Sequence, residues 1–376
     1  MKNDYGLYIH IPLCESKCRY CDFYKVTPKK WIGSNLFFKA LEIEFKNLPI
    51  NFNPTTIFIG GGTPSALNAD ELLNLFKLIK KYIDLENIKE WTVESNPASL
   101  DANKMKIMHE FGVNRLSIGI QSFNDNALKL LGRNHNSNLA IQKINESRGI
   151  GFKVINIDMI QAIPGMNKEE ILDELKNIKK IKPDHISYYN LIYEPNTPLT
   201  KDRDLGKLNL ISEDQEADIY FMIKEYLENI NYNQYEISNF SLKNQYSLHN
   251  MLYWKGGDYI GCGPSAHSHW NGIRYNKIND LNLYCKNLLD NKSIIKTEEK
   301  LSKINKAKEI FIMWLRLNKG VNIFEYEKKT KISLNNIYRN EVNDLIEKKL
   351  LIKDSGFIKI PENKKFLSDY VFSELV

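Results

Sequence analysis

Strand-like and helix-like patterns alternate along the first part of this 376-residue chain, and this alternation restricts the folds open to it. Short apolar runs typical of buried strands are separated by segments whose apolar residues recur at helical spacing, such as 69–82, 167–181 and 213–230. Six such units in about 230 residues favour an α/β fold with a partial or complete barrel over a small doubly wound sheet. The predicted strands are 6–11, 55–60, 90–95, 113–120, 153–160 and 185–192.

The pattern changes after residue 240. Residues 241–300 carry glycine and aromatic clusters without clear periodicity, and we interpret them as a connecting region. A helix is predicted from Ser302 and another over 337–351, followed by a short hairpin around Asp354-Ser355-Gly356. Two helices and a hairpin predict a small, mostly helical, winged-helix-like domain, which we expect to pack against the main domain rather than on DNA. The predicted units are 1–240, 241–300 and 301–376.

Charge and hydropathy narrow the function classes. The chain has 52 basic and 46 acidic residues, and 44 of the cations are lysines spread along it, so the net charge of +6 indicates a compositional bias rather than a nucleic-acid stripe. There is no apolar run of membrane-spanning length. The N-terminal apolar stretch is too short and too interrupted by polar residues for a signal peptide. The number of cysteines, five, is odd, which argues against a disulfide framework and for a reducing compartment. We therefore expect a cytoplasmic protein.

Three of the five cysteines are crowded into one loop after the first predicted strand, as Cys14, Cys18 and Cys21. Thiolates are soft ligands for zinc, copper(I) or iron–sulfur clusters. Structural zinc takes four protein ligands, and no further Cys or His pair follows at finger spacing. Three thiolates on a four-iron cluster would leave one iron free for a small molecule. We favour a cluster over zinc, and over three buried structural cysteines, because the intervening residues are polar.

Further candidates lie at the ends of the next predicted strands. Gly60-Gly61-Gly62-Thr63-Pro64 ends the second strand, where glycines would let a ligand approach the backbone or would simply form a tight turn. Glu94, Gln121 and Asp158 follow at or near the ends of later strands. Side chains at the carboxyl ends of barrel strands line active sites, so we expect these residues beside the cysteine loop, although each alone could be a helix cap or core residue.

The cysteine triplet, with Tyr20 before its last cysteine, resembles the signature of the radical S-adenosylmethionine (SAM) superfamily, and the glycine run resembles its glycine motif. The chain is also similar to the oxygen-independent coproporphyrinogen oxidase family and to its HemW-type haem-chaperone branch. The resemblance implies a partial (β/α)6 TIM-like barrel of the radical SAM type, and it extends over nearly the whole chain. It is carried by 8–12, 94–97, 115–123, 131–133, 235–240 and 249–254.

The resemblance implies roles for individual residues. Cys14, Cys18 and Cys21 would ligate a 4Fe–4S cluster whose open iron binds the amino and carboxylate groups of SAM. Arg133 offers a two-pronged donor to a carboxylate, and Asp158 can accept from two ribose hydroxyls. Tyr20 would shield the cluster or pack on SAM. The family's positions for binding SAM correspond to Tyr8, Gly61, Gly62, Thr63, Glu94, Gln121, Arg133 and Asp158.

Two features distinguish the branch. Coproporphyrinogen-oxidising members have a further cysteine two residues after the triplet, where this chain has Phe23, and a long extension before the cysteines, where this chain has thirteen residues. The stretch from His249 to Trp254 resembles the HNxxYW motif of the HemW-type branch. His249 is a candidate haem-iron ligand, with a structural hydrogen bond as the equal alternative, and Tyr253 and Trp254 are candidates to pack on a porphyrin face.

The resemblance thus implies a chaperone that binds haem as cargo and passes it to haemoproteins, including membrane haemoproteins. The alternative is an oxygen-independent coproporphyrinogen III oxidase, which Phe23 opposes. An RNA-modifying enzyme is disfavoured, and no nucleic-acid partner is expected. A homodimer is compatible with haem transfer. Departures from the family pattern occur at Gln161-Ala162 and Ser265, and Cys262 and Cys285 are interpreted as packing residues.

Overall fold

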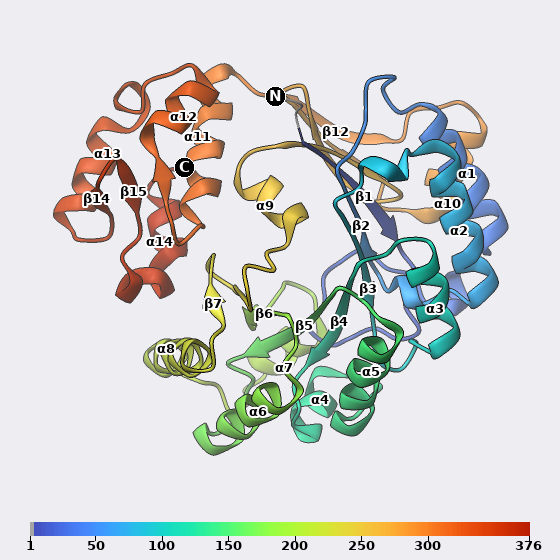
Figure 1. Ribbon diagram of the computed structural model, residues 1–376, viewed down its shortest axis with the longest axis horizontal. Coiled ribbons are helices and arrows are strands. Elements are labelled where there is room, and N and C mark those ends of the chain that lie inside the picture. The colour runs from blue at the N-terminus through green and yellow to red at the C-terminus, as the bar shows by residue number, and fades with distance from the viewer. Residues whose placement is uncertain (1–3) are drawn as a thin grey trace.

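The computed structural model describes residues 4–376, and its centre is a sheet whose six successive parallel strands each pair with the next (Figure 1). The sheet is unclosed, because its strand order runs from β12 at one edge to β7 at the other. This confirms the predicted α/β class and partial barrel. The parallel strands are β1 (Tyr5–Ile11), β2 (Thr56–Gly61), β3 (Glu90–Ser95), β4 (Arg115–Gln121), β5 (Val154–Gln161) and β6 (His185–Asn190).

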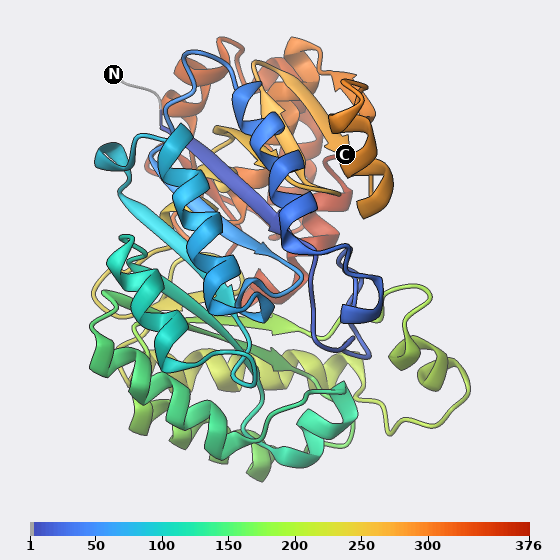
Figure 2. The ribbon, with the colours of Figure 1, turned by 90° about the vertical axis from the view of Figure 1, so that its right-hand side faces the viewer.

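Helices cover the outer side of this sheet (Figures 1 and 2). Their ends follow local capping signals: Asn68 and Glu71 form a reciprocal capping box at the start of α2, and Asn167 and Glu170 form one at α6. Among residues 4–376, no helix is long and apolar enough to cross a lipid bilayer. The helices between strands are α1 (Ser34–Lys46), α2 (Ala69–Tyr82), α3 (Ala102–Glu110), α4 (Asp125–Leu131), α5 (Ser137–Ile150), α6 (Lys168–Ile181), α7 (Pro198–Asp204) and α8 (Glu213–Asn229).

The segment without clear periodicity extends the sheet. Strand β9 (Asp258–Cys262) pairs in parallel with β1, and further strands continue antiparallel from it. A Cβ at Gly261 would collide with the carbonyl oxygen of His267, so a glycine is needed where β9 meets β10. Cys262 and Cys285 are buried in the main core, which confirms their interpretation as packing residues. The remaining elements between α8 and residue 300 are β7 (Asn233–Gln234), β8 (Asn239–Ser241), α9 (Leu248–Trp254), β10 (His267–Trp270), β11 (Ile273–Lys277), α10 (Leu281–Leu289) and β12 (Ile295–Lys300).

The C-terminal residues form a second apolar core around Phe311, Tyr326 and Leu345. It lies across α9 from the helices α1 and α2 (Figure 1). The helices and the hairpin predicted here are present, with the hairpin turning at Ser355 and Gly356, both at positive φ. The elements are α11 (Lys303–Leu315), β13 (Val321–Asn322), α12 (Ile323–Thr330), α13 (Asn335–Glu347), β14 (Ile352–Asp354), β15 (Phe357–Lys359) and α14 (Ser368–Ser373).

Candidate functional site

A cavity of about 480 Å³ opens at the carboxyl ends of the parallel strands. The cysteine loop follows β1, the glycine run ends β2, and polar side chains come from β3, β4 and β5. The structure therefore brings together, around one space, residues that the sequence predicts as a site from separate segments. Those lining the cavity are Cys14, Cys18, Tyr20, Cys21, Gly61, Gly62, Thr63, Glu94, Gln121, Arg133 and Asp158.

The cysteine loop is held in place by backbone hydrogen bonds at its start and between its second and third cysteines. The Cys14 amide donates to the Val26 carbonyl at 2.9 Å, and the Arg19 amide donates to the Leu131 carbonyl at 3.0 Å. The Cys14 thiol lies 3.3 Å from the Thr63 hydroxyl, and burial raises its pKa to about 11. A cationic metal centre would be needed to keep this sulfur as a thiolate at neutral pH.

Among residues 4–376, no three His, Cys, Asp or Glu side chains lie close enough together to hold a single metal ion. In a four-iron cluster each thiolate binds a different iron, so its ligands do not need to share one ion. Cys14 is buried, whereas Cys18 and Cys21 are partly exposed toward the cavity.

The glycine run is required by close approaches within the protein itself. Gly61 has a φ of +106°, and its amide donates to Glu94 Oε2 at 3.2 Å. A Cβ at Gly60 would lie 2.5 Å from the same Glu94 oxygen, and one at Gly62 would lie 2.7 Å from the Leu13 carbonyl oxygen. The run therefore lets the end of β2 pass close to both the cysteine loop and the carboxyl group of Glu94.

Two half-buried carboxyl groups, those of Glu94 and Asp158, line this cavity. Burial and the neighbouring charge of Asp158 raise the pKa of Glu94 to about 8, and the Gly61 amide opposes this shift. Burial also raises the pKa of Asp158, although the Ser117 hydroxyl and the Asn156 amide each donate to it at 2.9 Å. Such a pair suits a ligand that carries positive charge or several hydrogen-bond donors.

Arg133 supplies the opposite charge. Its Nη1 donates to Cys18 Sγ at 3.2 Å and its Nη2 to the Gly119 carbonyl at 2.6 Å. Its Nε is buried and has no hydrogen-bond partner among residues 4–376. A buried unpaired donor is costly unless a ligand satisfies it, and guanidinium groups suit carboxylates. The residues present therefore fit a carboxylate ligand next to a sulfur-ligated cluster.

Tyr8 and His249 do not line this cavity. Tyr8 is within 3.1 Å of His10 Nδ1, and burial raises its pKa. His249 is 0% exposed, and both of its ring nitrogens are engaged: Nδ1 lies 2.8 Å from the Thr56 hydroxyl, and Nε2 lies 2.7 Å from the Tyr253 hydroxyl. Burial lowers its pKa to about 3. Of the two roles considered for His249, these contacts favour the structural hydrogen bond.

The sequence did not single out the carboxyl end of β6 and the segment that follows it. Tyr189, Leu191 and Ile192 line the cavity, and Phe23 stands 73% exposed at its margin. These residues could have been predicted from the strand pattern, because β6 is parallel to β5 and its carboxyl end lies at the same edge of the sheet as the ends of β3 to β5.

Comparisons with known proteins agree with this architecture. Residues 8–178 match the family model of the Radical SAM superfamily, and residues 301–363 match that of the HemN C-terminal domain. The protein called heme chaperone HemW in Lactococcus lactis is 36% identical over 371 residues, which cover 98% of this chain and 96% of the relative. The chain belongs to the HemW family. The HemW protein of Bacillus subtilis is 32% identical and covers 97% of each chain.

The HemW-family chain also shares its fold with a solved enzyme structure. Coproporphyrinogen III oxidase (HemN) from Escherichia coli, described as a radical SAM enzyme, superposes with a TM-score of 0.86 over 99% of this chain and 90% of the enzyme. The two sequences are 22% identical, so the likeness shows a common fold and leaves the activity open.

Proposed function

We propose that this protein holds a 4Fe–4S cluster on Cys14, Cys18 and Cys21, binds SAM in the adjoining cavity, and carries haem to haemoproteins. The observation that supports the cofactor part is the convergence of three thiols, the unpaired Arg133 Nε and two half-buried carboxyl groups on one cavity of about 480 Å³. A volume of this size is ordinary for a cofactor site.

In this proposal each group meets a complementary part of SAM. When bound, the cluster would supply an open iron for the amino and carboxylate groups of SAM. Arg133 would hold the carboxylate through its buried guanidinium, and Asp158 would accept from the ribose hydroxyls. Glu94, whose raised pKa keeps its carboxyl mostly protonated at neutral pH, would donate to or accept from a polar group of the same molecule.

The haem part of the proposal draws on the relatives that are called heme chaperones and that align with the chain end to end. Phe23 supports the same reading, because coproporphyrinogen-oxidising members have a cysteine there. Its ring is exposed beside the cavity and contributes no metal ligand. We propose that the recipients are haemoproteins, and that oxidation of coproporphyrinogen III is the competing function.

Anaerobic reconstitution tests the cofactor part. We expect about four iron and four sulfide per chain and a change in the electron paramagnetic resonance spectrum of the reduced cluster when SAM is added. The cofactor part would be refuted if the protein bound zinc in place of iron, or if the spectrum did not change when SAM was added. Haem titration by absorbance then tests the cargo, and formation of protoporphyrinogen from coproporphyrinogen III under turnover conditions would establish the competing function.

A further inference from the structure

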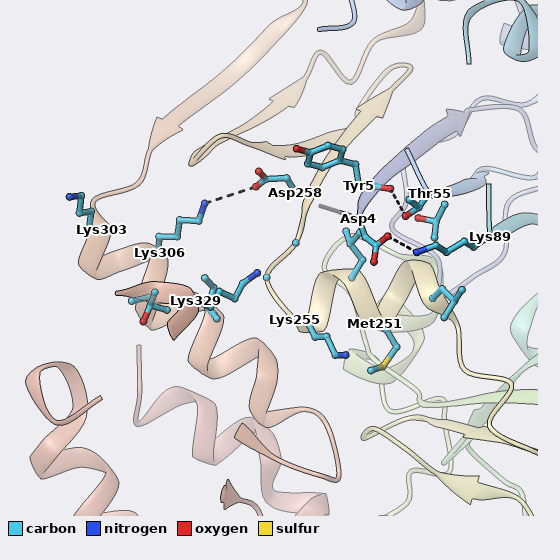
Figure 3. Close-up of a pocket in the computed structure, with 18 residues that line it drawn as sticks. Asp4, Tyr5, Thr55, Lys89, Met251, Lys255, Asp258, Lys303, Lys306 and Lys329 are labelled. Atoms are coloured by element: carbon cyan, nitrogen blue, oxygen red, sulfur yellow. Dashed lines mark hydrogen bonds and ion pairs between the residues drawn. The ribbon is translucent and has the colours of Figure 1, made fainter. Parts of the chain in front are cut away.

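A second cavity, of about 620 Å³, lies at the opposite end of the same strands from the cysteine loop. The residues before and at the start of β1, β2, β3 and β9 form one wall, and α9 lies beside them. The helices α11 and α12 of the C-terminal region form the facing wall (Figure 3). We call this the interdomain pocket, and no residue that lines it belongs to the site already described.

The interdomain pocket carries an excess of positive charge. Two of its five lysines have an acidic partner: Lys89 forms an ion pair with Asp4 at 2.7 Å, and Lys306 lies 4.0 Å from Asp258. The other three lysines have no carboxylate of residues 4–376 within ion-pair distance, so an anionic ligand would find unneutralised cations there. The five lysines that line the pocket are Lys89, Lys255, Lys303, Lys306 and Lys329.

Two of these lysines act on a third. Figure 3 shows Lys329 directed from α12 toward α9, while Lys306 points to Asp258 and Lys255 lies at the end of α9. Partial desolvation by the pocket walls lowers the pKa of Lys329, and the positive charges of Lys306 and Lys255 lower it further, whereas Asp258 raises it. The ammonium groups therefore lie within range of mutual repulsion, which a bound anion would relieve.

The same pocket has an apolar part. Leu248, Met251 and Leu252 of α9 line it on one side, and Ala307 and Ile310 of α11 line it on the other. Helix α9 thus has two different faces: His249 and Tyr253 point to Thr56 and the barrel interior, while Met251 and Lys255 face the pocket. Leu248 is exposed and Met251 is half-buried, whereas Leu252, Ala307 and Ile310 are almost fully buried behind them. Exposed apolar atoms next to unpaired lysines suit a ligand with an apolar part and more than one acidic group.

We infer that the interdomain pocket binds the tetrapyrrole cargo, with the macrocycle against Leu248 and Met251 of α9 and its two propionates on Lys255 and Lys329. The inference rests on the proposed haem-binding function and gives it a location. Haem is a flat, largely apolar ring with two carboxylates, and its acidic groups match the surplus cations. Binding here leaves the cysteine cavity free for SAM.

The test uses the 376-residue chain and two double variants of it with the same change in charge. Lys255→Glu/Lys329→Glu reverses two pocket cations, whereas Lys77→Glu/Lys106→Glu reverses two exposed lysines on α2 and α3. We expect the first to weaken binding of haem at least about tenfold and the second to leave it within about threefold of wild type. Metal-free protoporphyrin should show the same loss, because the lysines recognise carboxylates rather than iron.

Added salt gives an independent readout. Raising the ionic strength should weaken tetrapyrrole binding by the wild type and by the α2/α3 variant, and should affect the pocket variant less. If the wild type binds neither tetrapyrrole, the proposed haem function fails, and the inference with it. If the wild type binds and the pocket variant binds equally well, with an unchanged unfolding midpoint, the inference alone is overturned.

Discussion

Thr56 and His249 lie 193 residues apart in the chain and are joined by a hydrogen bond of 2.8 Å between Oγ1 and Nδ1. The opposite ring nitrogen of His249 meets the Tyr253 hydroxyl one helical turn later at 2.7 Å. Glu90 accepts from the backbone amides of Leu248 and His249 at the start of the same helix. These contacts attach α9 to the inner side of β2 and β3, and they make His249 part of the frame of the barrel.

Replacing His249 should therefore affect folding more than haem binding. His249→Ala leaves the Thr56 and Tyr253 hydroxyls without their partner and opens a cavity, so we expect the free energy of unfolding to fall by about 2–4 kcal/mol. Haem affinity of the folded protein should stay within about threefold of wild type. Urea unfolding and haem titration measure the two quantities.

The exposed His267 of β10 is the matched control, and His267→Ala should change neither quantity by more than about 0.5 kcal/mol. A His249→Ala protein of wild-type stability that no longer shifts the haem absorption band would instead identify this imidazole as an iron ligand.

The cysteines should separate into two groups. Replacing Cys14, Cys18 or Cys21 by alanine should lower the iron content after reconstitution to below about a tenth of wild type, because a cluster with two thiolates is poorly held. Cys285→Ala removes a buried packing side chain, so it should keep the iron and lose about 1 kcal/mol of stability. Iron and sulfide assays after anaerobic reconstitution measure the cluster content of each variant. A Cys18→Ala protein with the iron content of wild type would contradict the assignment of Cys18 as a cluster ligand.

Arg133 should matter for SAM rather than for iron. Arg133→Lys keeps the positive charge but cannot bind Cys18 Sγ and the Gly119 carbonyl together while presenting a further donor. We expect SAM affinity to fall about tenfold with iron content unchanged. Calorimetric titration of the reconstituted protein with SAM measures this affinity. The control variant is Arg148→Lys, on the exposed side of α5. Equal SAM affinity in both variants would remove Arg133 from the site.

Glu94 should make stability depend on pH. Its pKa is about 8 in the folded protein and 4.5 in an exposed glutamate, so the folded state binds more protons between these values. The free energy of unfolding should therefore fall as pH rises through this range, by up to about 1.4 kcal/mol per pH unit from this group. Glu94→Gln should flatten that slope.

The control for this prediction is Glu110→Gln, at the exposed end of α3. Unfolding midpoints of the three proteins, taken in urea from about pH 5 to about pH 9, give the comparison. A Glu94→Gln protein whose pH profile parallels that of wild type would show that this carboxyl is ionised throughout.

Periodic segments were predictable from the sequence because their burial pattern is local. The strand predicted at 90–95 has the bounds of β3, and the helix predicted at 69–82 has those of α2. The cysteine cavity was predictable for a related reason: parallel strands deliver their carboxyl ends to one face, so residues such as Glu94 and Asp158 meet there without any long-range signal in the sequence.

Pairings between distant segments could not be predicted in this way. Strand β9 contains two residues of intermediate exposure and two glycine or cysteine positions, so it shows neither alternation nor an apolar run, and its neighbour β1 lies some 250 residues away. The burial of His249 depends on Thr56, and the lysines of the interdomain pocket come from separate elements. Such features arise from tertiary packing, which no local pattern records.

The parallel pairing of Tyr5 with Asp258 has a consequence for synthesis on the ribosome. The outer edge of β1 has no partner until residues 258–262 have emerged, so a growing chain exposes unpaired backbone amides and carbonyls directly before the cysteine loop. Fragments that stop short of Asp258 are therefore expected to self-associate through this edge. The cysteine loop is expected to be best protected during metal loading once β9 has been synthesised and has paired with β1.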